Sequence, residues 1–127
     1  MKEAVLGIDL GTSAVKIIAV NQSGHVITST SVPLNLIQSQ PGYSEQDPEE
    51  WFNAVKTGIY RLNHSDEMKS YKVKGLSFSG QMHGLVALDK EGHPVRHAIL
   101  WNDTRNSEQC KQIRSVYGER LNGNPIL

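Results

Sequence analysis

The sequence is poor in the features that mark several large classes of protein. It holds one cysteine, Cys110, in 127 residues, so no internal disulfide can form, and a lone thiol is typical of a reduced, intracellular protein. Its 13 Lys and Arg balance 13 Asp and Glu, so it lacks the positive field that attracts nucleic acids and anionic membranes. We therefore expect a cytoplasmic protein that binds neither nucleic acid nor membrane.

Long apolar runs are also missing. No stretch approaches the roughly 18 consecutive apolar residues of a membrane span, and Asp9 interrupts the first apolar run before it reaches signal-peptide length. The mass of 14.1 kDa suits one domain, for which surface scaling predicts about 6,700 Å² of accessible surface and burial of about two thirds of the unfolded surface. Residues 118–127 return to turn formers and end in the apolar pair Ile126 and Leu127, which we interpret as a cut in a longer chain.

The sequence does contain a clear succession of strands. The apolar, β-branched runs Val5–Leu10, Val15–Val20 and Val26–Val32 predict three strands. Short turns around Gly11 and Gly24 join them. We therefore expect an antiparallel meander at the start of the chain.

A strong helix start follows the meander. Asp47 is a good N-cap, Pro48 suits the first helical position, and Glu50 occupies the capping-box position. One apolar stripe of this helix should pack on the sheet; it consists of Phe52, Val55, Ile59 and Leu62. The next run, Val73–Gly80, predicts a buried fourth strand, parallel to the first because a helical crossover precedes it.

The last third of the chain predicts a β-pair and a second helix. Leu85–Leu88 and Arg96–Leu100 flank a turn and predict a hairpin-like unit. Thr104 is placed to cap the last helix, and Gly118 can end it. The core face of that helix would carry Cys110, Ile113 and Tyr117. The predicted order is β-β-β-α-β, then a β-pair and a helix, which describes an α/β protein with a mixed sheet.

The segment Gly7–Ser13 is the most informative one chemically. It fits neither the P-loop nor the Rossmann glycine pattern, because a strand follows it where those motifs open a helix. Gly11 lets phosphate oxygens approach backbone N–H groups, and Thr12 and Ser13 add hydroxyls. Asp9 ends the strand with a carboxylate that can hold a hydrated Mg²⁺. The alternative for so short a pattern is an ordinary β-hairpin with a surface aspartate.

Two polar loops at strand ends are candidates for ligand binding, because ligands of α/β sheets bind at such ends. The loop after the fourth strand contains Gln81 and His83, which offer several hydrogen-bonding groups to hydroxyls. The loop after the last strand contains Trp101, an apolar plane, with Asn102 and Asp103, which suit a polyhydroxyl ligand. The plainer alternatives are a loop histidine bonded to backbone or water, and a cluster of helix-capping residues.

Four segments together resemble the FGGY family of carbohydrate kinases: 7–16, 43–49, 79–84 and 99–105. The resemblance covers essentially the whole chain. It implies an actin-like ATPase fold of two domains, each built around a ribonuclease-H-like mixed sheet, with sugar and ATP meeting in the cleft between them. Residues 1–127 would be the N-terminal portion of the first, sugar-binding domain, without the remainder of that domain and without the second, ATP-binding domain.

The resemblance also implies roles by position. It places Asp9 near Mg²⁺ and assigns the turn of Gly11, Thr12 and Ser13 to the phosphates of ATP. The residues it implies for the sugar are Met82, His83, Asn102 and Asp103, and their loop neighbours Gln81 and Trp101 complete the set of candidate sugar residues. The family's catalytic aspartate lies in a later segment, which is expected beyond Leu127, so no catalytic residue is expected in this chain.

The implied activity is ATP-dependent phosphorylation of D-xylulose by a complete kinase, with the isolated chain inactive. Kinases of the same family that act on gluconate, ribulose or glycerol share the phosphate turn and stay open as alternatives. Actin-like and chaperone-like ATPases use a similar turn without a small-molecule acceptor, and a stand-alone sugar-binding fragment is a third possibility. The oligomeric state also stays open, with a homodimer as one expectation.

Overall fold

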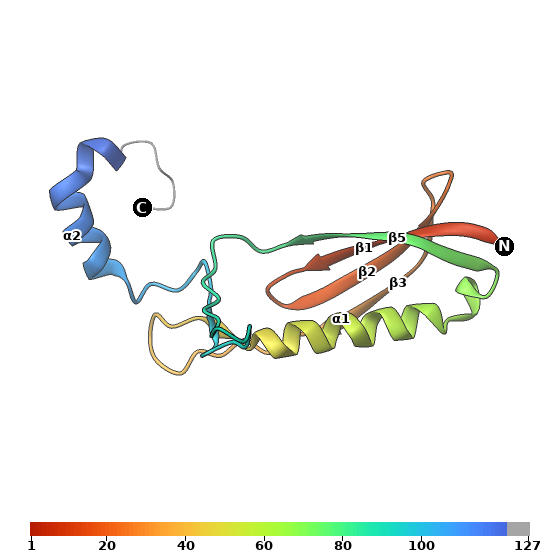
Figure 1. The fold of residues 1–127 in the computed structure, drawn as a ribbon, viewed down its shortest axis with the longest axis horizontal. Helices are drawn as coiled ribbons and strands as arrows, with labels where there is room; N and C mark the ends of the chain where they lie inside the picture. The colour runs from red at the N-terminus through yellow and green to blue at the C-terminus, as the bar shows by residue number, and fades with distance from the viewer. Residues whose placement is uncertain (122–127) are drawn as a thin grey trace.

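The fold is built on a four-stranded sheet with a helix packed on one face (Figure 1). The computed structural model describes residues 1–121. The first three strands form the predicted antiparallel meander: β1 (Lys2–Leu10), β2 (Ala14–Asn21) and β3 (Val26–Pro33). The elements that follow are α1 (Pro48–Asn63), the 3₁₀ turn η1 (Asp66–Met68) and β5 (Tyr71–Gly80). The sheet order is β3-β2-β1-β5, and β5 runs parallel to β1, so the predicted β-β-β-α-β order is confirmed.

The predictions for the end of the chain are only partly covered by the described residues. The apolar pair Ile126 and Leu127, where we interpreted the sequence as cut, lies outside residues 1–121. The structure therefore does not test that interpretation of Leu127, nor the expectation that a catalytic base follows it.

The start of α1 is partly as predicted. Asp47 caps the helix, and its carboxylate accepts a hydrogen bond from the Glu49 N–H at 2.9 Å. The predicted capping box is wrong, because the Glu50 carboxylate accepts from the backbone N–H of Asn35 at 2.7 Å instead. The helix start is therefore tied to the chain that leaves β3.

The face that α1 turns to the sheet differs from the predicted stripe by one residue. Phe52 is 61% exposed, so its predicted place in the core is wrong. The buried line of the helix runs through Ala54, Gly58 and Leu62, and on a helix this line continues back to Trp51, three residues before Ala54. Trp51 accordingly packs against the core.

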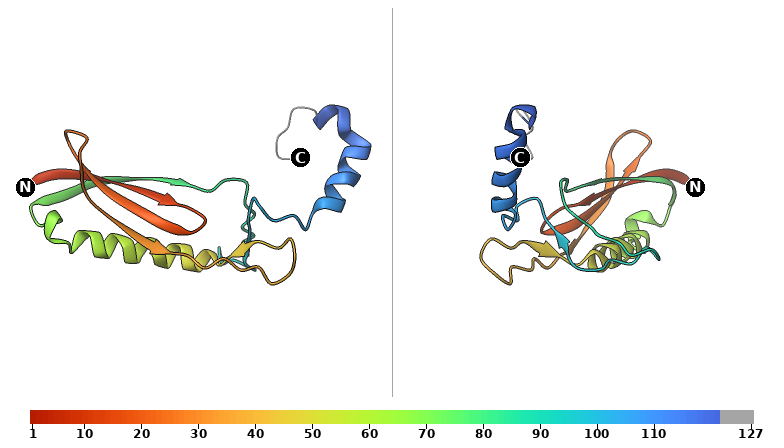
Figure 2. Two further views of the ribbon diagram at one scale, coloured as in Figure 1. Left: turned by 180° about the vertical axis from the view of Figure 1, so that it is seen from behind. Right: turned by 60° about the vertical axis from the view of Figure 1, so that its left-hand side comes forward.

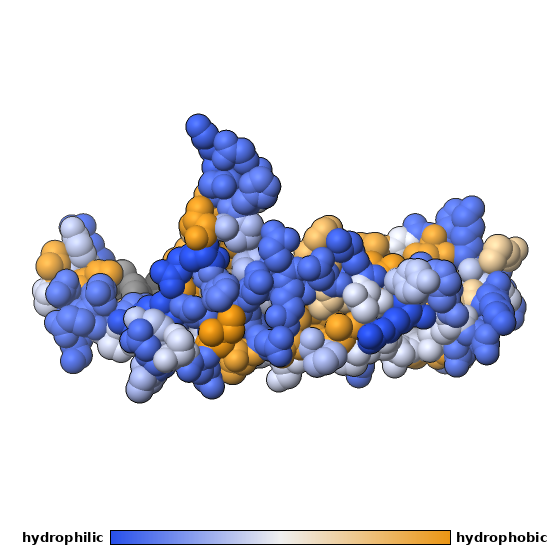
Figure 3. All heavy atoms as spheres, turned by 90° about the horizontal axis from the view of Figure 1, so that it is seen from below, coloured by the Kyte–Doolittle hydropathy of each residue, from blue (hydrophilic) through white to orange (hydrophobic). Residues whose placement is uncertain are grey.

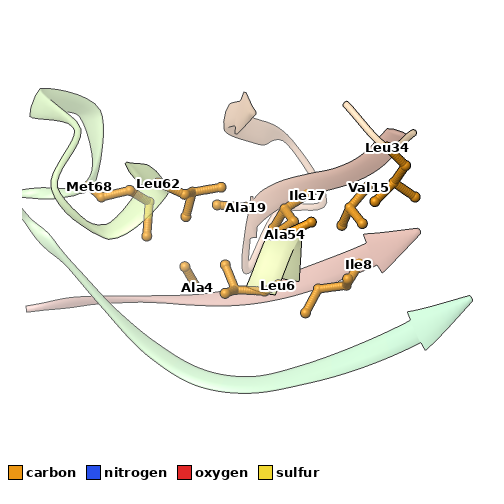
Figure 4. Packing of buried hydrophobic residues seen from close by; sticks show 10 residues of the cluster. All are labelled: Ala4, Leu6, Ile8, Val15, Ile17, Ala19, Leu34, Ala54, Leu62 and Met68. Carbon is orange, nitrogen blue, oxygen red and sulfur yellow. The ribbon is translucent and has the colours of Figure 1, made fainter. Parts of the chain in front are cut away.

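The hydrophobic core lies between the sheet and α1, as Figure 4 shows. Its buried members are Ala4, Leu6, Ile8, Val15, Ile17, Ala19, Leu34, Ala54, Leu62 and Met68. β1 and β2 each contribute every second residue, which is the pattern of strands with one buried face.

β5 is an edge strand of the sheet, so the prediction of a buried strand is wrong. The register places Leu76 beside Leu6 and Phe78 beside Ile8, yet Leu76 is 51% and Phe78 is 63% exposed. The reason is that α1 packs against β2 and β3 and leaves this side of β5 open from Leu76 on, whereas Tyr71 and Val73 at the start of the strand still pack against the core. Within residues 1–121, no strand pairs with the outer edge of β5. Seen from the side of α1, apolar patches interrupt the hydrophilic surface (Figure 3).

A second, two-stranded sheet joins the segment before α1 to the last third of the chain. β4 (Glu45–Gln46) pairs antiparallel with β6 (Ala98–Ile99). The predicted hairpin is only partly regular: Leu85 and Ile99 exchange two backbone hydrogen bonds, of 2.8 and 3.0 Å, and most of the unit is loop. β4 went unpredicted, because two residues are too few to show a strand period.

α2 (Ser107–Tyr117) and the 3₁₀ turn η2 (Gly118–Leu121) stand apart from the main sheet and α1 (Figures 1 and 2). The predicted cap is wrong, because the Thr104 hydroxyl donates to the carbonyl of Gly42 at 3.4 Å. No side chain of α2 is buried among residues 1–121, so the core face expected for it is not packed; Ile113 and Tyr117 are exposed and Cys110 is half-buried. The described helices include none that is long and apolar enough to span a membrane.

Candidate functional site

The turn after β1 and the loop after β5, both of which the sequence indicated as candidate binding segments, leave the sheet at the same end. β1 and β5 are parallel, and from the pair of Val5 and Gly75 to the pair of Leu10 and Gly80 they keep one register, so both strands end together. The backbone N–H of Gln81 donates to the carbonyl of Leu10 at 2.9 Å. The turn 11–13 and the loop 81–84 are therefore neighbours, although they are far apart in the sequence.

The turn between β1 and β2 is narrow. The Gly11 N–H donates to the carbonyl of Ala14 at 3.0 Å, and a Cβ on Gly11 would lie 3.2 Å from that same oxygen. Glycine thus suits the position sterically, as a phosphate-binding turn would require. Ser13 is exposed, and the Thr12 hydroxyl lies 3.4 Å from Oε1 of Gln81.

Asp9 lies on the sheet face opposite the core, in a shallow groove of about 420 Å³. The register places Lys16 directly across from it on β2, so an exposed carboxylate and an exposed ammonium are cross-strand neighbours. Sequence reasoning missed Lys16; counting residues outward from the turn would have paired it with Asp9, since the two strands form a tight hairpin.

The described residues bring no group of three His, Cys, Asp or Glu close enough to enclose a metal ion. Asp9 offers a single exposed carboxylate. This donor set fits Mg²⁺, which proteins commonly hold through one or two carboxylates while water and substrate phosphates complete the octahedron. A dedicated, all-protein metal site is not what these residues form.

An open pocket of about 940 Å³ lies between the loop 83–85, the segment 99–106 and the first turns of α2. It brings together three of the predicted sugar residues, His83, Trp101 and Asp103. The other three do not line it: Met82 is 67% exposed, Asn102 is also exposed, and Gln81 is half-buried.

The pocket also contains side chains that the sequence reasoning missed, namely Tyr43, Arg105, Asn106, Gln109 and Cys110. The polar residues at the start of α2 could have been found from the sequence, because they directly follow the candidate segment 99–105. Tyr43 begins the segment 43–49, which carries part of the family resemblance, but the β4–β6 pairing that brings it near this pocket is not visible in the sequence.

The backbone at His83 is left-handed, with φ 60°. Among the described residues, it is the only non-glycine residue with a positive φ. This conformation is uncommon for a residue with a Cβ and often marks a functional loop. It points to His83 as the member of its loop whose orientation matters.

Asp103 is held by neighbours on several sides. Its carboxylate accepts from the backbone N–H of Ser44 at 2.7 Å and from the Arg105 guanidinium at 2.7 to 3.0 Å. The bonds from Arg105 and the backbone N–H donors lower the pKa of Asp103 from an ordinary 3.8 to about 2. Asp103 is thus an anion in a rigid setting, with its side chain 2% exposed.

Arg105 joins Asp103 to a second buried carboxylate. Its guanidinium donates to Glu45 at 2.5 Å and stacks over the ring of Tyr43 at 3.6 Å. Hydrogen bonding to Arg105 lowers the pKa of Glu45, with Arg96 adding to the effect at 3.0 Å. The two carboxylates in turn raise the pKa of Arg105. This charge cluster fastens the 96–105 segment to β4.

Comparison with known proteins identifies relatives of this chain. A protein-family model, the FGGY family of carbohydrate kinases, N-terminal domain, matches residues 4–124. The xylulose kinase of Staphylococcus epidermidis is 68% identical over 127 residues, which are 100% of this chain and 26% of that kinase. The chain spans about a quarter of the length of the curated relatives it matches.

Two crystal structures from Lactobacillus acidophilus share the fold. A gluconate kinase superposes with a TM-score of 0.86 and a ligand-bound xylulose kinase with 0.85, each at 27% sequence identity. They match 94% and 93% of this chain, which correspond to 24% of each kinase chain. The predicted fold class, an actin-like ATPase domain with a mixed sheet, is confirmed by these neighbours.

Proposed function

The chain belongs to the FGGY family of carbohydrate kinases, and we propose that it is the N-terminal portion of the sugar-binding domain of a xylulose kinase. The complete enzyme would transfer the γ-phosphoryl group of ATP to D-xylulose in the cytoplasm. The observation that carries the choice of sugar is the 68% identity to a curated xylulose kinase along the whole chain. The turn 11–13 and the loop 81–84 lie side by side at one end of the sheet. This supports a phosphoryl-transfer site, because that reaction needs its two substrates next to each other.

On the nucleotide side, the narrow turn 11–13 would hold phosphates of ATP. The backbone N–H groups and the hydroxyls of Thr12 and Ser13 are suitable donors, whereas the Gly11 N–H already donates to the Ala14 carbonyl. Asp9 would bind Mg²⁺ that is also held by the phosphates, and this ion would neutralise their charge. Lys16, opposite Asp9 in the register, would add a positive charge within reach of the same phosphates.

On the sugar side, His83 and Trp101 would form the wall of the open pocket. His83 offers ring nitrogens to hydroxyls and Trp101 offers an apolar plane. Met82, Asn102 and Gln81 do not line the pocket and would contribute from its margin. Because the Asp103 carboxylate is occupied by Ser44 and Arg105, its role toward the sugar would include holding this wall in place.

In the proposed reaction, the sugar hydroxyl oxygen forms a bond to the γ-phosphorus while the bond to the β–γ bridging oxygen breaks, which gives ADP and a sugar phosphate. The hydroxyl proton must pass to a base. We propose that this base comes from a part of the kinase beyond Leu127, so the isolated chain should show no turnover.

Gluconate kinase is the second candidate function. The structural comparison does not separate it from xylulose kinase, since both structures from one organism match this chain equally well. The phosphate turn would serve either reaction, so the decision rests with the sugar loops.

A substrate panel tests the proposal. The protein to assay is a complete kinase that contains residues 1–127, for instance the Staphylococcus epidermidis enzyme with its matching segment replaced by this chain. We expect kcat/KM for D-xylulose to exceed that for gluconate, D-ribulose and glycerol by at least about tenfold. A preference for gluconate would favour the second candidate, and ATP hydrolysis that no sugar stimulates would contradict both. The isolated chain is the matched control and should phosphorylate none of the four.

A further inference from the structure

Gln46 is a buried polar residue between the two halves of the candidate site. It is 1% exposed and lies on β4, outside both loops. We propose that Gln46 is a positioning residue that fixes the phosphate turn and the sugar loop relative to each other. This inference rests on the proposed function of those two loops as the binding sites of ATP and sugar.

The side-chain amide of Gln46 is satisfied on both ends. Its Oε1 accepts from the indole N–H of Trp51 and from Nε2 of Gln81, each at 2.9 Å. Its Nε2 donates to the backbone carbonyl of Thr12 at 2.5 Å. One side chain therefore touches α1, the loop after β5 and the turn after β1.

The hydrogen-bonding groups of Trp51 and Thr12 allow the side-chain amide of Gln46 only one orientation. The indole of Trp51 can only donate and the carbonyl of Thr12 can only accept, so the oxygen of Gln46 must face the first and its nitrogen the second. Gln81 must then present its own nitrogen to Gln46. The oxygen of Gln81 is left facing the Thr12 hydroxyl at 3.4 Å.

The hydrogen bonds that connect Gln46, Gln81 and Thr12 form a closed ring, and these bonds differ in strength. The bonds of Gln46 are at ordinary or short distances, whereas the contact between Thr12 and Gln81 is long for an O–H donor. The Thr12 hydroxyl can therefore exchange Gln81 for a phosphate oxygen without disturbing the bonds made by Gln46. The spacing of the two loops is kept while the hydroxyl is free to bind.

β4 itself is anchored, so Gln46 is a fixed point for the two loops. Neighbouring residues of a strand point to opposite sides, and Glu45 uses the other side to bind Arg96 and Arg105. The pairing of β4 with β6 adds backbone hydrogen bonds. Movement of Gln46 would require the charge cluster to move as well.

The test is Gln46→Met in the complete kinase. The substitution preserves the length of the side chain, but it removes both the donor to the Thr12 carbonyl and the acceptor of the bonds from Trp51 and Gln81. We expect kcat to fall about tenfold to a hundredfold, the loss that follows a displacement of reacting groups of about 1 Å. Each KM should change less than about threefold, because each loop can still bind its own substrate. Gln112→Met, on the exposed surface of α2, is the matched control and should leave kcat unchanged.

Three outcomes would overturn the inference: an unchanged kcat, a rise in KM alone, or a fall in activity that only matches a loss of folded protein measured by circular dichroism. If Gln46→Met does not fold, Gln81→Met breaks the same link from the half-buried end and must lower kcat while the KM for ATP stays unchanged. The KM for the sugar is no criterion for this variant, because Gln81 is itself a candidate sugar residue. The assay uses whichever sugar the unsubstituted kinase accepts. A wild-type preference for gluconate would thus contradict the proposed function while leaving this inference testable.

Discussion

At the scale of single residues, His83 shows how a backbone angle can point to function. The histidine holds φ at 60°, where an L-residue is strained and glycine is not. Sequence reasoning identified His83 as a candidate from its chemistry. It could not have found the strain, because loop conformation is set by contacts with distant segments such as the one around Ile99.

Replacing His83 by glycine separates conformation from chemistry. In His83→Gly, the φ of 60° costs nothing, so we expect the free energy of unfolding to stay within about 1 kcal/mol of wild type. The imidazole is lost, so the KM for the sugar should rise about threefold to tenfold, the value of one hydrogen bond. Steady-state kinetics of the complete kinase and urea unfolding measure the two effects. His93→Gly, in an exposed turn, should leave the KM unchanged; an unchanged KM in His83→Gly itself would remove His83 from the sugar site.

The charge cluster makes a prediction about pH. The folded-state pKa of Asp103 is lowered from 3.8 to about 2, so its ionised form stabilises the fold above about pH 4, and this contribution disappears as the pH falls through about 2. Asp103→Asn cannot ionise. We therefore expect the variant to be less stable than wild type at about pH 6, with a difference that shrinks between about pH 4 and pH 2.

Urea unfolding at several pH values measures that difference. Asp66→Asn is the control, because its partner Lys69 and Asp66 itself are both highly exposed, and exposed pairs contribute little at any pH. A pH-independent gap between wild type and Asp103→Asn would mean that Asp103 is not stabilised as an anion.

At the scale of elements, the contact between α1 and β2 depends on one glycine. A Cβ on Gly58 would lie 2.6 Å from Cδ1 of Ile17, which is fully buried. The glycine therefore lets the helix sit close to the sheet. A helix interior normally favours alanine over glycine by about 1 kcal/mol, so here packing and helix propensity oppose each other.

We expect packing to win. Gly58→Ala should lower the free energy of unfolding by about 1–3 kcal/mol, the usual cost of overfilling a core. Ile17→Val removes the Cδ1 atom that clashes, so the double variant should be more stable than the sum of the two single changes predicts. Urea unfolding of all four proteins gives the coupling energy. A stabilising Gly58→Ala would show that the core yields easily at this point.

The elements also show which parts of the fold are readable from sequence. Strands and helices with long periodic patterns, such as Val26–Val32, were predicted to within a few residues. Errors arose where a tertiary contact decided the outcome. Glu50 accepts a hydrogen bond from Asn35 instead of capping its own helix. Trp51 packs against the core in place of Phe52, because the position of the sheet determines which face of α1 is buried. The two-residue strand β4 and its charge cluster are long-range features, and no local pattern encodes them.

At the scale of the whole molecule, the chain exposes more surface than its mass predicts. Its accessible surface is 8725 Å², whereas a compact monomer of this size would expose about 6,700 Å². The expected burial of two thirds is therefore wrong. The excess has visible sources, since α2 stands apart and β5 presents Leu76 and Phe78 to solvent.

Leu76 and Phe78 give a prediction that differs between the isolated chain and the complete kinase. In the isolated chain both side chains are more than half exposed, so Leu76→Ser and Phe78→Ser should change the free energy of unfolding by less than about 0.5 kcal/mol. They should also reduce self-association, because they remove an apolar patch beside an open strand edge. Sedimentation velocity and binding of a hydrophobic dye measure that change.

In the complete kinase, under the proposed function, the same two positions are covered by the remainder of the sugar-binding domain. Each serine would then lose about 2–3 kcal/mol of apolar burial, which lowers the melting temperature by several degrees. Val26→Ser, at an exposed strand end, is the control and should be neutral in both proteins. The expected loss of stability is near zero in the isolated chain and large in the complete kinase. An equally small loss in both proteins would show that β5 stays an open edge. The proposed place of this chain within a larger domain would then be wrong.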